Sequence, residues 1–167
     1  MSPGLRRAAL GLLAGATLLL AGCAQPQPVP RHDDASTSVW RGRLALQVED
    51  SPSQSFSAGF ELTGRPDAGA LLLYNPFGGT LAALNWAPGS ATLRSGSEVR
   101  NFDSIDALVT GATGTAIPVA SLFDWLAGNN TAVAGWEADL SQLDQGRLRA
   151  RRVAPTPAAD LRVALDR

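Results

Sequence analysis

Apolar and polar positions alternate along most of the chain with the period of two that is typical of β-strands. In residues 40–48, Leu44, Leu46 and Val48 share one face, and polar or small residues occupy the other. The same pattern recurs in residues 56–62. Shorter apolar runs bounded by Pro, Gly, Asn or Asp predict further antiparallel strands. We expect these strands at residues 71–74, 81–86, 91–94, 98–102, 136–140, 146–153 and 161–165.

The period changes to that of an α-helix between the sixth and seventh of these strands. Asp103 or Ser104 can cap a short helix that stops at Gly111. A second helix is predicted in residues 117–128, because its apolar positions follow the i, i+3, i+4, i+7 spacing. Strands, two short helices and strands again predict a mainly β fold, a curved antiparallel sheet with the helices across its concave face.

One predicted hairpin carries a large apolar side chain at its tip. Asn75, Pro76, Gly78 and Gly79 have turn chemistry, and Phe77 lies among them. Phe77 either folds back onto its own sheet or enters another apolar phase, since a tip residue has no local core to bury it.

The first residues predict export and lipidation. Arg6 and Arg7 precede an apolar run, residues 8–21, which has the length of a signal-peptide core and is too short to span a bilayer. The run ends in Leu-Ala-Gly before Cys23, the chain's single cysteine, which is the pattern of a bacterial lipobox. We therefore expect residues 1–22 to be removed and Cys23 to be acylated.

The next residues are a tether and the folded domain. Residues 23–39 are rich in Pro and polar side chains and lack apolar periodicity, so they predict a flexible tether. Residues 40–167 are enough for one domain with one core. Ala24 follows the cysteine, which by the sorting rule of enterobacterial lipoproteins implies the outer membrane.

Composition limits the kinds of binding and catalysis that the domain can carry out. Without residues 1–22 the chain has 12 basic side chains, all arginine, against 15 acidic ones, so it lacks the basic field that nucleic-acid binding needs. The single histidine, His32, lies in the predicted tether, and the thiol of Cys23 is expected to carry a lipid. The domain is therefore left without a His base, a free thiol or a Cys/His metal site. We expect no enzyme, cofactor or metal. The remaining catalytic alternative is a hydrolase built from Glu49, Asp50, Glu61 and Asp67.

Arginines alternate along one of the last predicted strands. Arg147, Arg149 and Arg151 share a face, with Arg152 beside them. The stripe is either the solvated face of a strand or a surface for anionic lipid head groups or an acidic partner.

Together these features resemble the LolB family of outer-membrane lipoproteins. The resemblance is carried by Trp-Arg-Gly-Arg-Leu-Ala-Leu in residues 40–46, by residues 71–78 with their Asn-Pro-Phe-Gly tip, and by the Ile-Pro to Leu-Ala-Gly stretch of residues 117–128. Gly135 and Trp136 fit the strand that follows.

The resemblance implies an incomplete antiparallel β-barrel whose helices cover an apolar cavity. It also implies a monomeric protein, anchored through Cys23 at the periplasmic face of the outer membrane, that receives triacylated lipoproteins from the periplasmic carrier LolA and inserts them into outer-membrane lipid. By the loop motif, Pro76, Phe77 and Gly78 form the membrane-inserting loop. Phe60 and Trp125 map to aromatic positions of the family's cavity. The expected cavity residues are Leu44, Leu46, Phe56, Phe60, Leu71, Leu73, Leu81, Trp86, Leu122, Phe123 and Trp125.

Two other functions remain open at this point. A passive outer-membrane lipoprotein that only assembles with other proteins predicts no cavity of acyl-chain size. A periplasmic binder of small apolar ligands predicts a closed barrel with polar groups converging inside it. The shape and lining of the cavity separate these functions, and the sequence alone does not decide which face of each strand points inward.

Overall fold

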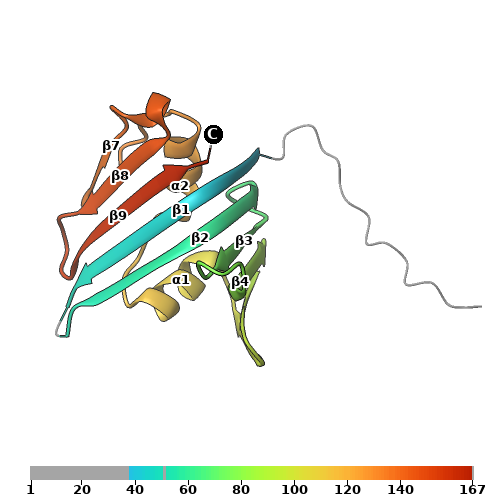
Figure 1. Ribbon diagram of the computed structural model, residues 1–167. Helices are drawn as coiled ribbons and strands as arrows, with labels where there is room; N and C mark the ends of the chain where they lie inside the picture. The colour runs from blue at the N-terminus through green and yellow to red at the C-terminus, as the bar shows by residue number, and fades with distance from the viewer. Residues whose placement is uncertain (1–37, 51, 167) are drawn as a thin grey trace, which may run out of the picture. The chain divides into compact units, whose positions relative to one another are not determined.

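All strands of the domain belong to one antiparallel sheet. The computed structural model describes residues 38–50 and 52–166, and in it nine strands follow the order β6-β5-β4-β3-β2-β1-β9-β8-β7 (Figure 1). The predicted signal peptide, Cys23 and most of the tether lie outside the described residues. The strands are β1 (Ser38–Glu49), β2 (Gln54–Gly64), β3 (Gly69–Tyr74), β4 (Thr80–Ala87), β5 (Ser90–Ser95), β6 (Glu98–Phe102), β7 (Trp136–Asp139), β8 (Arg147–Arg152) and β9 (Ala158–Leu165).

The two longest strands pair to form the middle of the sheet. β1 pairs with β2 from Ser38 to Val48, with Leu44 opposite Ala58 and Leu46 opposite Phe56. On its other side β1 pairs with β9, so the first and last strands are neighbours. Within the described residues the sheet ends at β6 and β7 without a pairing between them, which confirms the predicted incomplete barrel.

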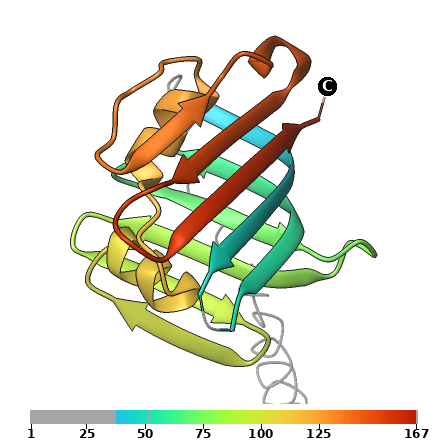
Figure 2. The same ribbon diagram turned by 90° about the vertical axis from the view of Figure 1, so that its left-hand side faces the viewer.

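The core lies on the concave face of this curled sheet. The period of two predicted for β1 is present as burial, since Leu46 and Val48 are buried while Gln47 is exposed. On β2 the inward positions are Ala58, Phe60 and Leu62. Figure 2 shows that both helices lie on the inner side of the curl, as the sequence predicts.

Helix α1 (Ile105–Thr113) begins as predicted but ends later. The Ser104 side chain caps it by accepting a hydrogen bond from the backbone N–H of Ala107 at 3.1 Å. The predicted end at Gly111 is wrong, because the helix continues to Thr113 and terminates at Gly114. Gly114 adopts a left-handed conformation, φ 71°, and its N–H donates to the carbonyl oxygen of Thr110.

Helix α2 (Val119–Leu126) follows Pro118 and is shorter than the predicted 117–128. Gly128 has φ 88°, and its N–H donates to the carbonyl oxygen of Trp125 at 3.0 Å. A one-turn 3₁₀ helix, η1 (Leu143–Gln145), joins β7 to β8. The linker between the two α-helices places Thr115 in the core, where its hydroxyl accepts a hydrogen bond from the Arg152 guanidinium of β8.

Candidate functional site

An apolar interior lies between the concave face of the sheet and the two helices. It contains a cavity of about 50 Å³, and none of the residues that line it is polar. The lining comes from β1, β2, β3, β4 and β9 on one side and from α1 and α2 on the other. The whole surface can therefore contact hydrocarbon but offers no polar anchor for a hydrogen-bonding ligand.

Nine of the expected cavity residues lie in or around this interior. Leu44, Phe60, Leu71, Trp86 and Leu122 line the cavity directly. Leu46, Phe123 and Trp125 are buried in the surrounding core, and half-buried Leu73 packs against the same core.

Aromatic side chains fix helix α2 against the sheet. The ring of Phe123 meets Trp40 edge-on at a centroid distance of 5.5 Å and Trp86 at 6.2 Å. Trp125 is fully buried, and its indole N–H donates to the carbonyl oxygen of Thr131 at 2.9 Å. The hydroxyl of Thr131 donates in turn to the Asp124 carboxylate at 2.8 Å. These bonds join α2 to the loop that follows it.

The structure does not bring Phe56 and Leu81 to the cavity. Phe56 is on the same face of β2 as Phe60 but lies near the β1–β2 turn, where 41% of it is exposed. Leu81 is 36% exposed and lies at a β-bulge, where the pairing shifts from Leu73 opposite Ala82 to Tyr74 opposite Thr80.

Several lining residues were not among those expected from the sequence. For Leu62 the signal was present in the sequence, because Leu62 has the same parity as Phe60 along its strand. For Leu161 it was not, because only the strand register places it opposite Leu46. The additional lining residues are Leu62, Leu84, Ile105, Val109, Val119, Leu126, Leu161 and Val163.

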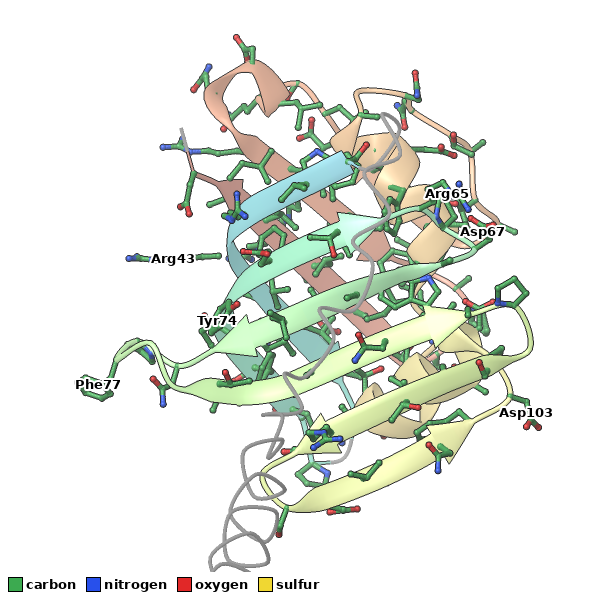
Figure 3. The ribbon with its side chains drawn as sticks, turned by 90° about the vertical axis from the view of Figure 1, so that its right-hand side faces the viewer. Arg43, Arg65, Asp67, Tyr74, Phe77 and Asp103 are labelled. Carbon is green, nitrogen blue, oxygen red and sulfur yellow. The ribbon has the colours of Figure 1, made fainter. Side chains whose placement is uncertain are left out.

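The β3–β4 loop presents Phe77 to solvent. Phe77 is 97% exposed, so it does not fold back onto its own sheet, and Figure 3 shows it at the far end of the loop. The Asn75 side chain accepts hydrogen bonds from the N–H groups of Phe77 and Gly79, both at 2.9 Å. Gly78 has φ 83°, a left-handed conformation that favours glycine. The loop is thus held by its own hydrogen bonds with Phe77 pointing outward.

The acidic residues considered for catalysis form ion pairs or lie apart from the interior. Glu61 accepts from Arg41 at 2.7 Å, and Asp67 accepts from Arg65 at 3.3 Å. The Arg41 guanidinium has its pKa raised by this bond to Glu61. Among residues 38–50 and 52–166, no three His, Cys, Asp or Glu side chains are grouped closely enough to hold a metal ion.

The fold and the site together define a class of protein: an open antiparallel β-barrel whose apolar interior is covered by two short helices. In this chain the barrel also carries an exposed phenylalanine at the tip of one loop.

A family model described as outer membrane lipoprotein LolB matches residues 39–154. The outer-membrane lipoprotein LolB of Bordetella petrii is 32% identical, with 93% of this chain and 90% of that protein aligned. The LolB of Cupriavidus taiwanensis is 34% identical over 86% of this chain and 71% of its own length. The LolB of Bordetella pertussis is 33% identical over 75% and 74%.

The chain belongs to the outer-membrane lipoprotein LolB family, which confirms the resemblance found in its sequence. Membership places it among outer-membrane lipoproteins concerned with lipoprotein localisation. In the part of the chain that the structure describes, no helix has the length and apolar character needed to cross a membrane.

Proposed function

We propose that this protein receives triacylated lipoproteins from the periplasmic carrier LolA in its apolar interior and inserts them into the outer membrane without enzymatic chemistry. The observation that carries the proposal is the interior itself, which is apolar on every side and closed by two short helices. The proposal includes cleavage after residue 22, acylation of Cys23 and attachment to the periplasmic face of the membrane by a tether that extends to residue 39.

Hydrocarbon burial explains why such a protein is needed. A triacylated lipoprotein has on the order of 45 methylenes, and at about 0.8 kcal/mol each their exposure to water would cost roughly 35 kcal/mol. The chains must therefore stay shielded throughout transfer. An acceptor that binds them less favourably than a bilayer does can release them without an energy source.

The interior must open to accept acyl chains. Its cavity of about 50 Å³ has room for only a few water molecules and is far too small for three acyl chains. The helices that cover it are short, because α1 has nine residues and α2 has eight. Both pack against the sheet through their apolar side chains. We infer that ligand entry moves these helices away from the sheet, with the linker at Thr115 held to β8 by Arg152.

Phe77 supplies a docking contact with the membrane. At about 25 cal/mol per Å², burying most of the roughly 200 Å² of a phenylalanine side chain in the acyl region contributes about 2–4 kcal/mol. A contribution of this size is reversible by itself, and the acylated Cys23 is the second attachment that makes binding stable.

A two-step transfer assay tests the proposal. LolA loaded with a radiolabelled lipoprotein is mixed with this protein, first without and then with liposomes. We expect the label to move to this protein and then to the liposomes, and Phe77→Glu to block only the second step. Val99→Glu is the matched control, because Val99 is another exposed apolar residue, 47% exposed, on β6.

Two results would contradict the proposal. If the label stays on LolA, the protein is not an acceptor, and the passive assembly lipoprotein becomes the better explanation. If Phe77→Glu passes label to liposomes as fast as the unmodified protein, Phe77 has no part in insertion.

A further inference from the structure

The convex face of the sheet, opposite the helices, carries a cleft lined by arginines. Arg43 of β1, Arg147 and Arg149 of β8 and Arg162 of β9 surround a volume of about 450 Å³. The sequence shows only the alternating arginines of β8, of which Arg147 and Arg149 line the cleft. Arg43 and Arg162 join them through strand pairing.

The register of three strands explains why the arginines enclose a hollow. In one row across the sheet, Arg43 lies opposite Ala164, which lies opposite Arg147. In the next row on the same face, Ala45 lies opposite Arg162, which lies opposite Arg149. Small side chains therefore alternate with long ones, and Ala45, Ser57 and Ala164 form a low floor between the guanidinium groups.

Two of the four arginines are fixed by one carboxylate. Asp160 accepts from Arg149 at 2.5 Å and from Arg162 at 2.9 Å. Asp139, which also lines the cleft, accepts from the backbone N–H of Ser141 at 2.9 Å. Asp160 therefore holds two guanidinium groups in place and balances only part of the charge of the cleft.

The other two arginines have no such partner. In the described part of the chain, Arg43 and Arg147 form no ion pair with a carboxylate, and Arg147 is only within 3.5 Å of the side-chain oxygen of Gln142. Their guanidinium groups keep donors free for phosphate oxygens, which arginine binds with planar, paired hydrogen bonds.

The cleft faces the same side of the molecule as Phe77. Arg43 lies opposite Gly59, which lies opposite Tyr74, the last residue before the β3–β4 loop. Figure 3 shows Arg43 and Phe77 both projecting to one side of the sheet. Figure 2 shows the β3–β4 loop on the side of the sheet away from the helices. Insertion of Phe77 into a bilayer therefore turns the arginine cleft toward the phosphate layer.

We propose that this cleft binds the head group of an anionic phospholipid and orients the domain on the membrane surface. Because the cleft and Phe77 lie on the same side of the sheet, we favour a lipid surface over an acidic protein as the partner. The orientation of the cleft toward the membrane rests on the proposed membrane role of Phe77; the binding of a head group by the arginines does not. Arg43 and Arg147 contact the phosphate, while Arg149 and Arg162, fixed by Asp160, define the rim of the site.

Vesicle binding tests this assignment. A soluble form that starts at Ala24 lacks the acylated cysteine and keeps all residues that the structure describes. It is sedimented with vesicles of phosphatidylcholine alone and of phosphatidylcholine with phosphatidylglycerol. The double variant Arg43→Gln/Arg147→Gln is compared with Arg94→Gln, an exposed arginine on β5 outside the cleft. Circular dichroism and thermal unfolding verify that each variant is folded.

The expected loss follows from the charge removed near an anionic surface. Each arginine there strengthens binding about fivefold, so the double variant binds the phosphatidylglycerol vesicles roughly 25-fold more weakly. Arg94→Gln changes this binding by less than about twofold, and binding to pure phosphatidylcholine stays unchanged in both variants. Phe77→Glu, in contrast, weakens binding to both vesicle types.

Two outcomes overturn the proposal. If the double variant binds phosphatidylglycerol vesicles as tightly as the unmodified protein, the cleft is not a lipid site. If it binds those vesicles normally but no longer accepts label from LolA, the cleft contacts an acidic protein surface. Neither result alters the liposome step of the Phe77→Glu transfer assay, so failure of the cleft leaves the proposed function separately testable.

Discussion

The indole N–H of Trp125 donates to the backbone carbonyl oxygen of Thr131 at 2.9 Å, from a side chain that has no exposed surface. This bond connects the last turn of α2 to the loop that leads back to the sheet. It satisfies the one polar atom that Trp125 brings into the apolar interior, so the helix can be covered by hydrocarbon on its inner face without leaving a buried donor unpaired.

Trp125→Phe tests the strength of this attachment. The change removes the hydrogen bond, leaves the Thr131 carbonyl without that donor and opens space in the core, so we expect the free energy of unfolding to fall by about 2–4 kcal/mol. Urea denaturation measures the loss. Thr131→Ala keeps the carbonyl acceptor and removes only the exposed bond to Asp124, and it should cost less than about 1 kcal/mol. Equal losses in both variants would contradict the role given to the indole bond.

Asp160 predicts a specific dependence of stability on pH. The guanidinium of Arg149, and after it that of Arg162, lowers the pKa of this carboxyl from 3.8 to about 2. A pKa lowered by folding stabilises the native state above the unfolded pKa, and this stabilisation is lost as pH falls through the folded value. Asp160→Asn should therefore lower the free energy of unfolding by about 1 kcal/mol at neutral pH, since solvent weakens the pair. The difference from the unmodified protein should vanish between about pH 4 and pH 2 in acid titrations monitored by urea unfolding.

The hydrogen bonds of Asn75 predict a role in loop rigidity. Asn75→Ala removes the acceptor for the N–H groups of Phe77 and Gly79. We expect a loss of about 1 kcal/mol in stability and slower delivery of label to liposomes, with capture from LolA unchanged. Asn75→Asp retains the acceptor oxygen and serves as the control. Delivery by Asn75→Ala at the rate of the control would show that the loop needs no such preorganisation.

A larger side chain at Val163 tests the interior separately from the loop. Val163 lines the cavity from β9, opposite Leu44. Val163→Phe occupies space that an acyl chain needs and overpacks the core by about 1–3 kcal/mol. Capture from LolA should be impaired at the first step, in contrast to Phe77→Glu, which should be impaired at the second. Val163→Ile adds one methylene and should retain most capture; loss of capture by both variants equally would indicate damage to the fold, which thermal unfolding would reveal.

The strand pattern and the family motifs predict most of this fold because they depend on local periodicity and turn chemistry. Gly111 shows where local reasoning fails. A glycine at this position favours a helix end, but the helix continues through Gly111, which lies against β6. A Cβ there would lie 3.1 Å from the ring of Phe102, so a larger residue would require that ring to shift. The residue that ends the helix is Gly114, whose positive φ no sequence pattern distinguishes from its neighbours.

The two candidate sites differ in how far the sequence predicts them. Phe77 is recognisable because its whole environment is one five-residue turn. The arginine cleft is not, because Arg43 and Arg147 are more than a hundred residues apart in the chain and meet only across β9. Likewise, the inward face of β9 follows from its register with β1, which joins the two ends of the domain and leaves no mark on either strand alone.

The pairing of β1 with β9 also sets the order in which the domain is completed. β1 occupies the middle of the sheet, yet one side of it stays without hydrogen-bond partners until Ala158–Leu165 has been synthesised and exported. Until then the chain presents an open strand edge beside a hydrophobic face, which is the kind of surface that templates aggregation. Productive folding therefore waits for the last strand, because a pairing between segments so far apart in the chain forms more slowly than local contacts do.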